Sequence, residues 1–291
     1  MKEQVREVLD QGLQNLQTWR NSFGEWESDS SLSIPEEKLT TVFKELSERL
    51  SGNYPFHHPV YAGQMLKPPH PVAWAAYSMA MTINPNNHAL DGGPPSSEME
   101  KEVMAELSNF FGYGETFLGH LTSSGTIANL EALWISRKSH PEKKIAFSEN
   151  SHYTHERMCE VLGVEGVKVK INEDGSFDLN ALNPQEIGTI IVTLGTTGLG
   201  EVEHLDQVLP WAKENGIRIH IDSAYGGFFR ALKDSDSIDG TQWKLMQEAD
   251  SIVVDPHKHG LQPYGCGAVL FKDPSVGRFY KHDSPYTYFT S

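Results

Sequence analysis

The sequence has few cysteines, a deficit of positive charge and no long hydrophobic run. Only Cys159 and Cys266 occur in 291 residues, which excludes a disulfide framework and gives no zinc-site spacing. Lys and Arg number 24 against 39 Asp and Glu, a net charge of −15 that argues against nucleic acid and anionic membranes as partners. No apolar stretch is long enough to cross a bilayer, and the first residues do not resemble a signal peptide. These absences predict a cytoplasmic protein.

The composition is that of an ordinary globular protein, with 38% hydrophobic and 22% charged residues. Residues 1–65 are predicted to be an N-terminal helical segment that serves packing or dimer contact. Its clearest helical period runs through Leu39, Val42, Phe43, Leu46 and Leu50. Residues 51–98 are rich in Pro, His, Gly and Asn and predict no regular element until a helix at 98–111. Residues 66–291 are predicted to form one large domain.

From residue 116 onward, β-rich apolar segments alternate with helical patterns. Such alternation predicts an α/β domain with a mostly parallel sheet and helices on both faces. The last strand follows its predecessor after a loop too short for a helical crossover, so it is expected to run antiparallel. The predicted strands are 117–122, 144–148, 167–171, 189–193, 217–221, 252–254 and 267–271, and the predicted helices are 128–136, 156–162 and 205–215.

The segment 251–260 places a lysine directly after a predicted buried strand. Asp255 and Pro256 end the β-branched stretch, and Lys258 then stands at the carboxyl end of the strand, where open α/β sheets bind ligands. A lysine shielded from water loses part of its preference for the ammonium form. Its amine can then form a Schiff base with a carbonyl cofactor, above all pyridoxal 5′-phosphate (PLP). The alternative is an ordinary solvated lysine.

A turn rich in hydroxyl groups, Ser124-Gly125-Thr126, lies between a predicted strand and a predicted helix. The exposed amides and the dipole at a helix start favour phosphate, and glycine lets the backbone approach it closely. The turn is neither a P-loop nor a dinucleotide fingerprint, because the required Gly-Lys-Ser/Thr and Gly-x-Gly-x-x-Gly spacings are missing. An ordinary Ser/Thr helix cap is the alternative interpretation.

Two further groups follow predicted strands. Asp222 ends the strand 217–221, where its carboxylate can keep the nitrogen of a heteroaromatic ring protonated, and Ala224 leaves room on one ring face. His152 follows the strand 144–148, and its imidazole can stack on such a ring. A helix cap or metal carboxylate for Asp222, and a histidine without function, are the alternatives.

Histidine pairs elsewhere do not complete a metal site. No third ligand with suitable spacing accompanies them, so no metal is predicted. The pairs considered are His57 with His58 and His152 with His155, and His70 also stands beside a proline. The phosphate cradle, His152, Asp222 and Lys258 instead follow successive strands in chain order, where one ligand could contact all of them.

These residues together resemble the fold-type-I PLP enzymes, specifically the group II amino-acid decarboxylases. The resemblance runs from about residue 58 to 291. The Asp-Pro-His-Lys form is most similar to the tyrosine/aspartate decarboxylases of archaea and some bacteria. The resemblance to the family depends on five segments: Ser124-Gly-Thr-Ile-Ala-Asn-Leu-Glu-Ala132, Ser151-His-Tyr, Gly195-Thr-Thr197, His220-Ile-Asp-Ser-Ala-Tyr225 and Asp255-Pro-His-Lys258.

The resemblance implies a role for each matched residue. Lys258 would hold PLP as a Schiff base, Asp222 would pair with the pyridinium nitrogen, and His152 would stack on the ring. Ala224 would lie on the opposite ring face, with Thr197 beside the ring. The phosphate would be held by Ser124, Gly125, Thr126 and His257.

Three departures from the family pattern stand out. The family often has Asn where this chain has Asp255, and Asp where it has Glu203. The family also continues into a smaller C-terminal domain, which is expected to be absent from this chain. Tyr286 and Tyr288 near its end are candidates for the proton donor that family members carry on a mobile loop.

The resemblance predicts decarboxylation of an L-amino acid to an amine and carbon dioxide, in a homodimer. Two alternatives stay open at this point. One is another PLP reaction, carbon–carbon cleavage or transamination. The other is a catalytically silent PLP-binding or dimerisation module, which the missing domain would favour.

Overall fold

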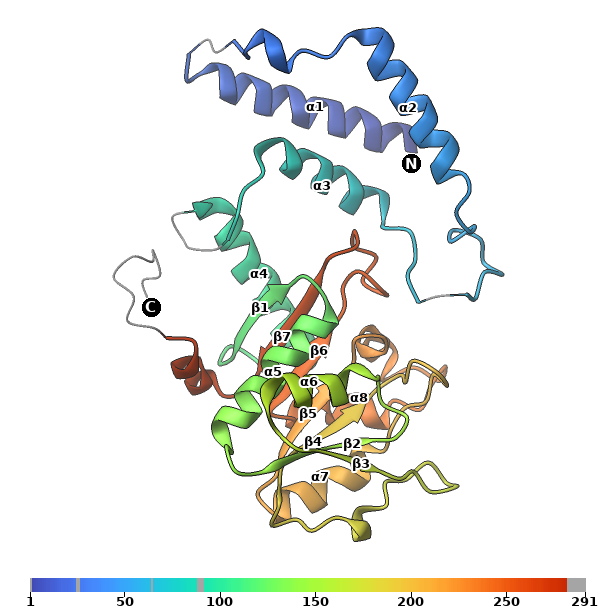
Figure 1. Cartoon of the computed structure of the whole chain (residues 1–291), viewed down its shortest axis with the longest axis vertical. Helices are drawn as coiled ribbons and strands as arrows, with labels where there is room; N and C mark the ends of the chain where they lie inside the picture. Colours follow the sequence, from blue (N-terminus) through green and yellow to red (C-terminus); the bar gives the residue numbers. More distant parts are fainter. Residues whose placement is uncertain (1, 25–26, 64, 88–91, 282–291) are drawn as a thin grey trace. The chain divides into compact units, whose positions relative to one another are not determined.

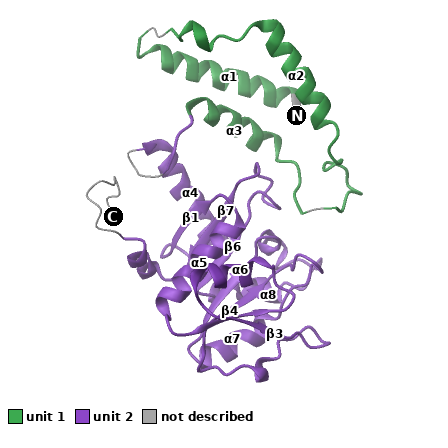
Figure 2. Cartoon of the chain, in the orientation of Figure 1, with its two compact units in different colours: residues 1–83 green, residues 84–291 purple. Residues whose placement is uncertain are grey.

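The structure is a computed structural model that describes residues 2–24, 27–63, 65–87 and 92–281. The chain divides into two compact units, residues 1–83 and 84–291 (Figure 2). The predicted boundary between residues 65 and 66 falls within the first unit, in the loop before its last helix. Among the described residues, no helix is both long and apolar enough to span a membrane. Tyr286 and Tyr288 lie outside the described residues.

The first unit consists of α1 (Lys2–Asn21), the short 3-10 turn η1 (Ser30–Leu32), α2 (Glu36–Leu50) and α3 (Pro71–Ile83). Helix α1 packs on α3 at Gly12, where a Cβ atom would lie 2.5 Å from the sulfur of Met79. Arg20 Nη2 also donates to the carbonyl of Thr82 at 2.7 Å. By contrast, none of the residues 36–50 that form α2 is buried.

The expectation of no regular element in 51–98 was wrong at two places. Helix α3 occupies 71–83, and α4 (Pro94–Phe111) begins four residues earlier than predicted. Helix α3 is apolar almost all round, so it lacks the period that marks an amphipathic helix. Both helices begin with proline, which the first turn tolerates because its N–H groups have no intrahelical acceptor.

The second unit is built on a seven-stranded sheet in the order β1-β7-β6-β5-β4-β2-β3 (Figure 1). Strand β7 runs antiparallel to both of its neighbours, whereas the other described pairs are parallel. The predicted α/β class and the antiparallel last strand are therefore confirmed. The strands are β1 (Leu118–Thr122), β2 (Lys144–Ser148), β3 (Gly166–Val169), β4 (Ile187–Thr193), β5 (Arg218–Asp222), β6 (Ser251–Val254) and β7 (Gly267–Phe271).

Helices cover both faces of this sheet because alternate strand residues point to opposite sides. Val253 and its cross-strand partner Val269 pack against α5 (Gly125–Ser139), while Ile252 and Val254 face the opposite core. Helix α6 (Thr154–Leu162) joins α5 on the first face, over β2 and β4. The other face carries α4, α7 (Leu205–Glu214) and α8 (Thr241–Leu245). Short 3-10 turns complete the unit: η3 (Leu179–Ala181), η4 (Gly227–Leu232), η5 (Met246–Glu248) and η6 (Pro274–Phe279).

Candidate active site at the carboxyl edge of the sheet

Strands β5 and β6 bring two of the predicted site segments together. They are parallel neighbours, and the register pairs Asp222 with Val253. The chain leaves β6 one residue later, so Asp255 and the following turn lie at the same edge of the sheet as Asp222. The backbone confirms this proximity, since the amide of Asp255 donates to the carbonyl of Ala224 at 3.3 Å.

Lys258 is largely buried, and its amine contacts Asp255. Its side chain is 19% exposed, and Nζ lies 3.0 Å from Oδ2 of Asp255. The Asp255 carboxylate in turn lies against Gly125, where a Cβ atom would be 2.7 and 2.8 Å from its two oxygens. Lysine, carboxylate and glycine turn therefore form one contiguous group, and the amine is shielded from bulk water.

Asp255 is the member of this group whose charged form is least favoured by its surroundings. Burial raises the pKa of its carboxyl group, while the neighbouring Lys258 and His257 act in the opposite direction. Its Oδ1 has no hydrogen-bond partner among the described residues. His257 Nδ1 accepts from the amide of Cys266 at 3.2 Å, so the ring proton belongs on Nε2, which lies 3.5 Å from Asp255 Oδ2. An acidic group that can be neutralised is thus held beside a helix start.

The start of α5 has the construction expected of an anion cradle. Ser124 is the N-cap, and its Oγ accepts from the amide of Ile127 at 3.3 Å. The amides of Gly125 and Thr126 belong to the first turn, where no intrahelical acceptor exists, and the helix dipole adds positive potential. A Cβ atom on Gly267 would lie 2.5 Å from the carbonyl carbon of Ser124, so β7 approaches this turn closely.

Asp222 is held in place by both of its oxygens. Oδ1 accepts from the amide of Ala224 at 3.1 Å, and Oδ2 lies 3.1 Å from Nε2 of His155. Burial alone would raise the pKa of Asp222, but His155 and the Ala224 amide outweigh it and hold the pKa well below its ordinary value. The carboxylate therefore stays ionised at any ordinary pH, as a partner for a protonated ring nitrogen must.

His152 lies within the electrostatic reach of this group. Its pKa is lowered, first by burial and then by the nearby His155 and Lys258, with Asp222 opposing. The imidazole is therefore neutral at pH 7, and Nδ1 lies 2.6 Å from Oγ1 of Thr154. Thr197 is exposed in the turn after β4.

Several polar groups beneath this edge were not predicted as site residues. Glu203 is buried, accepts from the amide of Thr193 at 2.6 Å and contacts the hydroxyl of Ser148. Burial raises its pKa to about 7, against the opposing effect of these hydrogen bonds. His155 was considered only as a metal ligand, yet the described residues hold no group of three or more side chains arranged for a metal ion. The sequence did carry a signal, because His155 occupies the apolar face of α6 with Met158, Cys159 and Leu162.

A family model described as "Pyridoxal-dependent decarboxylase conserved domain" matches residues 26–277. The chain belongs to this family. The resemblance drawn from the sequence motifs is thereby confirmed, and with it PLP as the family's cofactor.

Curated relatives carry amino-acid decarboxylase names. A probable L-tyrosine/L-aspartate decarboxylase of Methanococcus maripaludis (strain C5) is 28% identical over 84% of this chain and 67% of its own length. The L-tyrosine/L-aspartate decarboxylase of Methanocaldococcus jannaschii is 33% identical over 65% of this chain and 52% of its own length. The L-tyrosine decarboxylase of Enterococcus faecium is 26% identical over 86% of this chain and 58% of its own length. The chain thus spans about half to two thirds of these relatives.

Solved structures share the fold. The glutamate decarboxylase domain of a Vibrio parahaemolyticus diaminobutyrate protein superposes with a TM-score of 0.77 at 23% identity, covering 97% of this chain and 67% of that one. Mouse CSAD superposes with a TM-score of 0.76 at 22% identity, covering 99% of this chain and 61% of that one.

The side chains at this edge fit PLP. A largely buried lysine, an ionised carboxylate and a helix start whose glycine lets a neighbouring group, here Asp255, approach closely are all present. The buried, unpaired Oδ1 of Asp255 beside that helix start is the feature that fits an anion least well. A carboxyl group whose pKa is raised can take up a proton, which removes the conflict.

Proposed function

We propose that this chain forms the cofactor-binding part of a PLP-dependent amino-acid decarboxylase that releases carbon dioxide and an amine. The observation that carries the proposal is the grouping of Lys258, Asp255 and Gly125 beside an ionised Asp222. Family membership and the names of the curated relatives support the same reaction class.

When bound, PLP accepts the electron pair of the Cα–carboxylate bond that breaks. Lys258 supplies the amine that anchors the cofactor. Asp222 keeps the ring nitrogen protonated, and His152, neutral at pH 7, offers a flat imidazole face at the same edge. Ala224, being small, leaves space by the ring, and Thr197 is proposed to lie beside it.

The phosphate is proposed to bind at the start of α5, with the amides of Gly125 and Thr126, the Ser124 hydroxyl and His257 as its donors. Asp255 takes a second role there. Its Oδ2 lies 3.0 Å from Lys258 Nζ, so it can accept the proton that the amine must lose before it reacts. The resulting neutral acid no longer repels the phosphate, which explains how a carboxyl group is tolerated at this position.

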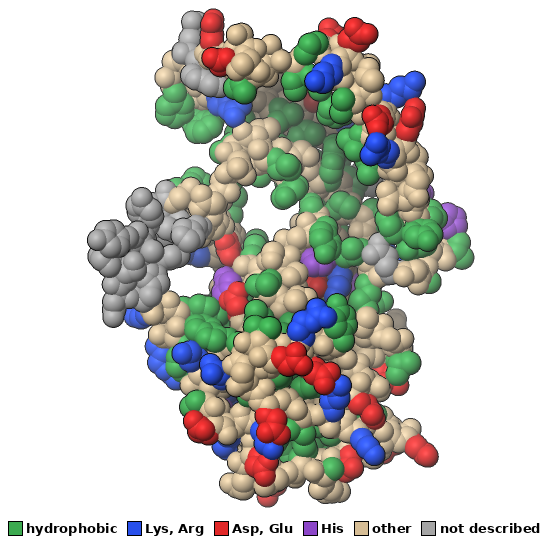
Figure 3. All heavy atoms as spheres, viewed as in Figure 1, with side chains coloured by type: hydrophobic (Ala, Val, Ile, Leu, Met, Phe, Trp, Pro, Cys, Tyr) green, Lys and Arg blue, Asp and Glu red, His purple; other side chains and the backbone are tan. Residues whose placement is uncertain are grey.

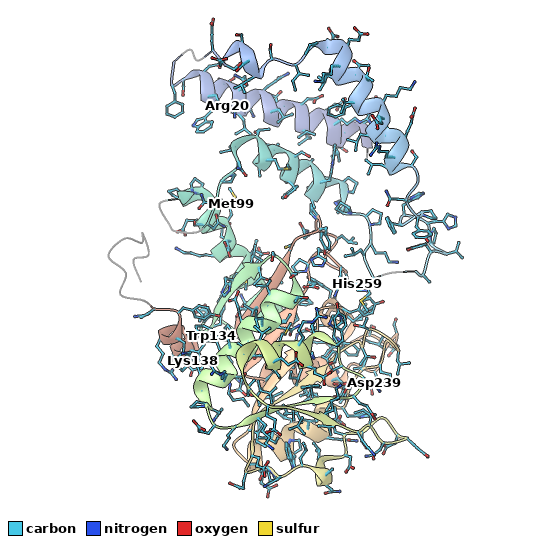
Figure 4. All side chains as sticks on the ribbon, in the orientation of Figure 1. Arg20, Met99, Trp134, Lys138, Asp239 and His259 are labelled. Atoms are coloured by element: carbon cyan, nitrogen blue, oxygen red, sulfur yellow. The ribbon has the colours of Figure 1, made fainter. Side chains whose placement is uncertain are left out.

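The first experiment measures cofactor attachment. PLP is titrated into the full chain, and the bound form is reduced with borohydride and mapped by mass spectrometry. We expect the cofactor mass on Lys258 and no visible absorption band in Lys258→Ala. Lys138 is an exposed lysine in the last turn of α5 (Figure 4), and Lys138→Ala is the matched control. A band that persists in Lys258→Ala would remove the assigned role.

The second experiment identifies the reaction. A panel of L-amino acids, beginning with tyrosine and aspartate, is incubated with the PLP-loaded chain, and products are analysed. Carbon dioxide with an amine supports decarboxylation. A keto acid or an aldehyde would indicate transamination or carbon–carbon cleavage instead. A bound cofactor without any product would favour a silent PLP-binding module.

We also propose that the protein is a homodimer that buries the apolar stripe of α2. Five side chains of that stripe are 44–59% exposed, and apolar atoms lie at the surface of this unit in the space-filling view (Figure 3). Exposed apolar stripes of this kind mark interaction surfaces. The five are Leu39, Val42, Phe43, Leu46 and Leu50.

Sedimentation tests the dimer. We expect the wild-type chain to sediment as a dimer and Phe43→Glu as a monomer, since a charge would be buried in the interface. Lys44→Glu changes the neighbouring residue outside the stripe and serves as the control. A monomeric wild type would refute this part of the proposal. We also propose a cytoplasmic location, which the free thiols of Cys159 and Cys266 support.

A further inference from the structure

His155 is a fully buried imidazole to which the proposed chemistry gives no task. It lies in the first turn of α6 with 0% of its surface exposed. Its Nε2 lies at an ion-pair distance of 3.1 Å from Oδ2 of Asp222, although neither ring nitrogen has a hydrogen-bond partner of regular geometry among the described residues. Burying a polar group costs free energy unless it is paired. The contact with Asp222 is therefore the reason that an imidazole is tolerated there.

The surroundings would otherwise suit an apolar side chain. His155 shares the inner face of α6 with Met158 and Cys159, and the Phe147 ring lies 6.1 Å from its imidazole. Helical periodicity alone would place Leu or Phe at this position. Packing thus gives no reason for a histidine, whereas the carboxylate of Asp222 does.

His220 provides a comparison within the same core. It is also fully buried and lies two residues before Asp222 on β5, but its two nitrogens are paired with Ser251 at 2.9 Å and Asn129 at 2.8 Å. Burial lowers its pKa to about 3, so it is neutral. The charged or titratable groups that act on Asp222 are His152, His155, His220, Glu203 and Asp255. Among these groups, His155 is the one with a side-chain nitrogen, Nε2, at 3.1 Å from a carboxylate oxygen of Asp222.

We propose that His155 is a positioning residue for Asp222. Its Nε2 lies 3.1 Å from Oδ2 and the Ala224 amide donates to Oδ1, so both oxygens of the carboxylate are contacted. The orientation and the negative charge of Asp222, which face the cofactor nitrogen in the proposed function, then depend on His155. This residue comes from α6, whereas Asp222 ends β5. This inference rests on the proposed function for the role of Asp222, but the pair itself exists without the cofactor.

The test compares two substitutions of similar shape. Gln can place a donor near the position of Nε2, whereas Met fills the space without one. In the cofactor-free full chain, the carboxyl carbon of Asp222 is followed by NMR in a 13C-aspartate-labelled sample, with Asp222→Asn used for assignment. We expect Asp222 to stay ionised to lower pH in wild type and His155→Gln than in His155→Met, because burial alone raises the pKa of a carboxyl group.

A second arm measures PLP affinity by absorbance titration of the same chains. We expect His155→Met to bind PLP about 10- to 100-fold more weakly, the range for losing a hydrogen bond to a charged group, with His155→Gln restoring most of the affinity. His220→Gln and His220→Met are the controls for general damage to the core. They should leave the Asp222 titration close to that of wild type.

The outcomes separate this inference from the proposed function. Equal behaviour of His155→Gln and His155→Met in both arms would overturn the positioning role, as would an equal effect of His220→Met on Asp222. If the wild type does not bind PLP, the proposed function fails, and the NMR arm alone decides whether the pair exists. A shift in both arms that is confined to His155→Met supports the inference.

Discussion

Replacing Glu203 by Gln should stabilise the protein at alkaline pH. The carboxyl group is buried, and its pKa is raised from 4.5 to about 7, chiefly by that burial. At about 1.4 kcal/mol for each pH unit, this difference corresponds to about 3 kcal/mol. Gln has a similar shape, keeps an oxygen that accepts from the Thr193 amide and keeps a polar group beside the Ser148 hydroxyl, which donates to Glu203 in the wild type.

The sign follows from proton binding. Between about pH 4.5 and 7 the folded chain holds the Glu203 proton and the unfolded chain has lost it, so the free energy of unfolding falls as pH rises. The Gln variant has no such proton. Wild type and variant should therefore be about equally stable near pH 5, and the variant should be more stable by about 3 kcal/mol at pH 8.

Urea unfolding monitored by tryptophan fluorescence at pH 5 and pH 8 measures this difference, since other titrating groups cancel between the two chains. Glu201 lies two residues away, is exposed and accepts from Asn150 at 3.2 Å. Glu201→Gln should show no such pH-dependent gain. A Glu203→Gln variant that is equally or less stable than wild type at pH 8 would refute the conclusion that burial raises the pKa of Glu203.

Three further substitutions test the site. Gly125→Ala places a Cβ atom 2.7 Å from Asp255 Oδ1. It should weaken PLP binding and lower stability by about 1–3 kcal/mol, measured by titration and thermal unfolding; unchanged values would mean that the cradle is misplaced. Asp255→Asn removes the group proposed to accept the Lys258 proton and should slow the attachment of PLP by at least about 100-fold at pH 8, where an unchanged rate would contradict that role. Asp222→Asn should still attach PLP through Lys258, although at least as weakly as His155→Met, and should slow product formation by at least about 100-fold; unchanged turnover would remove its role.

Chain-local patterns predicted most of the second unit. The strands around Lys258 and Asp222 are short β-branched runs that end in turn residues, and a local pattern suffices to find them. The direction of β7 also followed from a local quantity, the length of the loop that joins it to β6. Helix α3 was not predicted, because an almost wholly apolar helix has no hydrophobic period. The start of α4 was predicted four residues too late, because its first turn resembles a proline-rich loop.

The sequence by itself determined the chemistry that is available: an amine and a carboxylate after two strands, and a glycine turn at a helix start. Only the tertiary structure decided which groups contact one another. The approach of Asp255 to Gly125 joins segments 130 positions apart in the chain, and that of His155 to Asp222 joins α6 to the end of β5. Such contacts depend on strand order and helix placement, which are set by the burial of the whole core and leave no local pattern in the sequence.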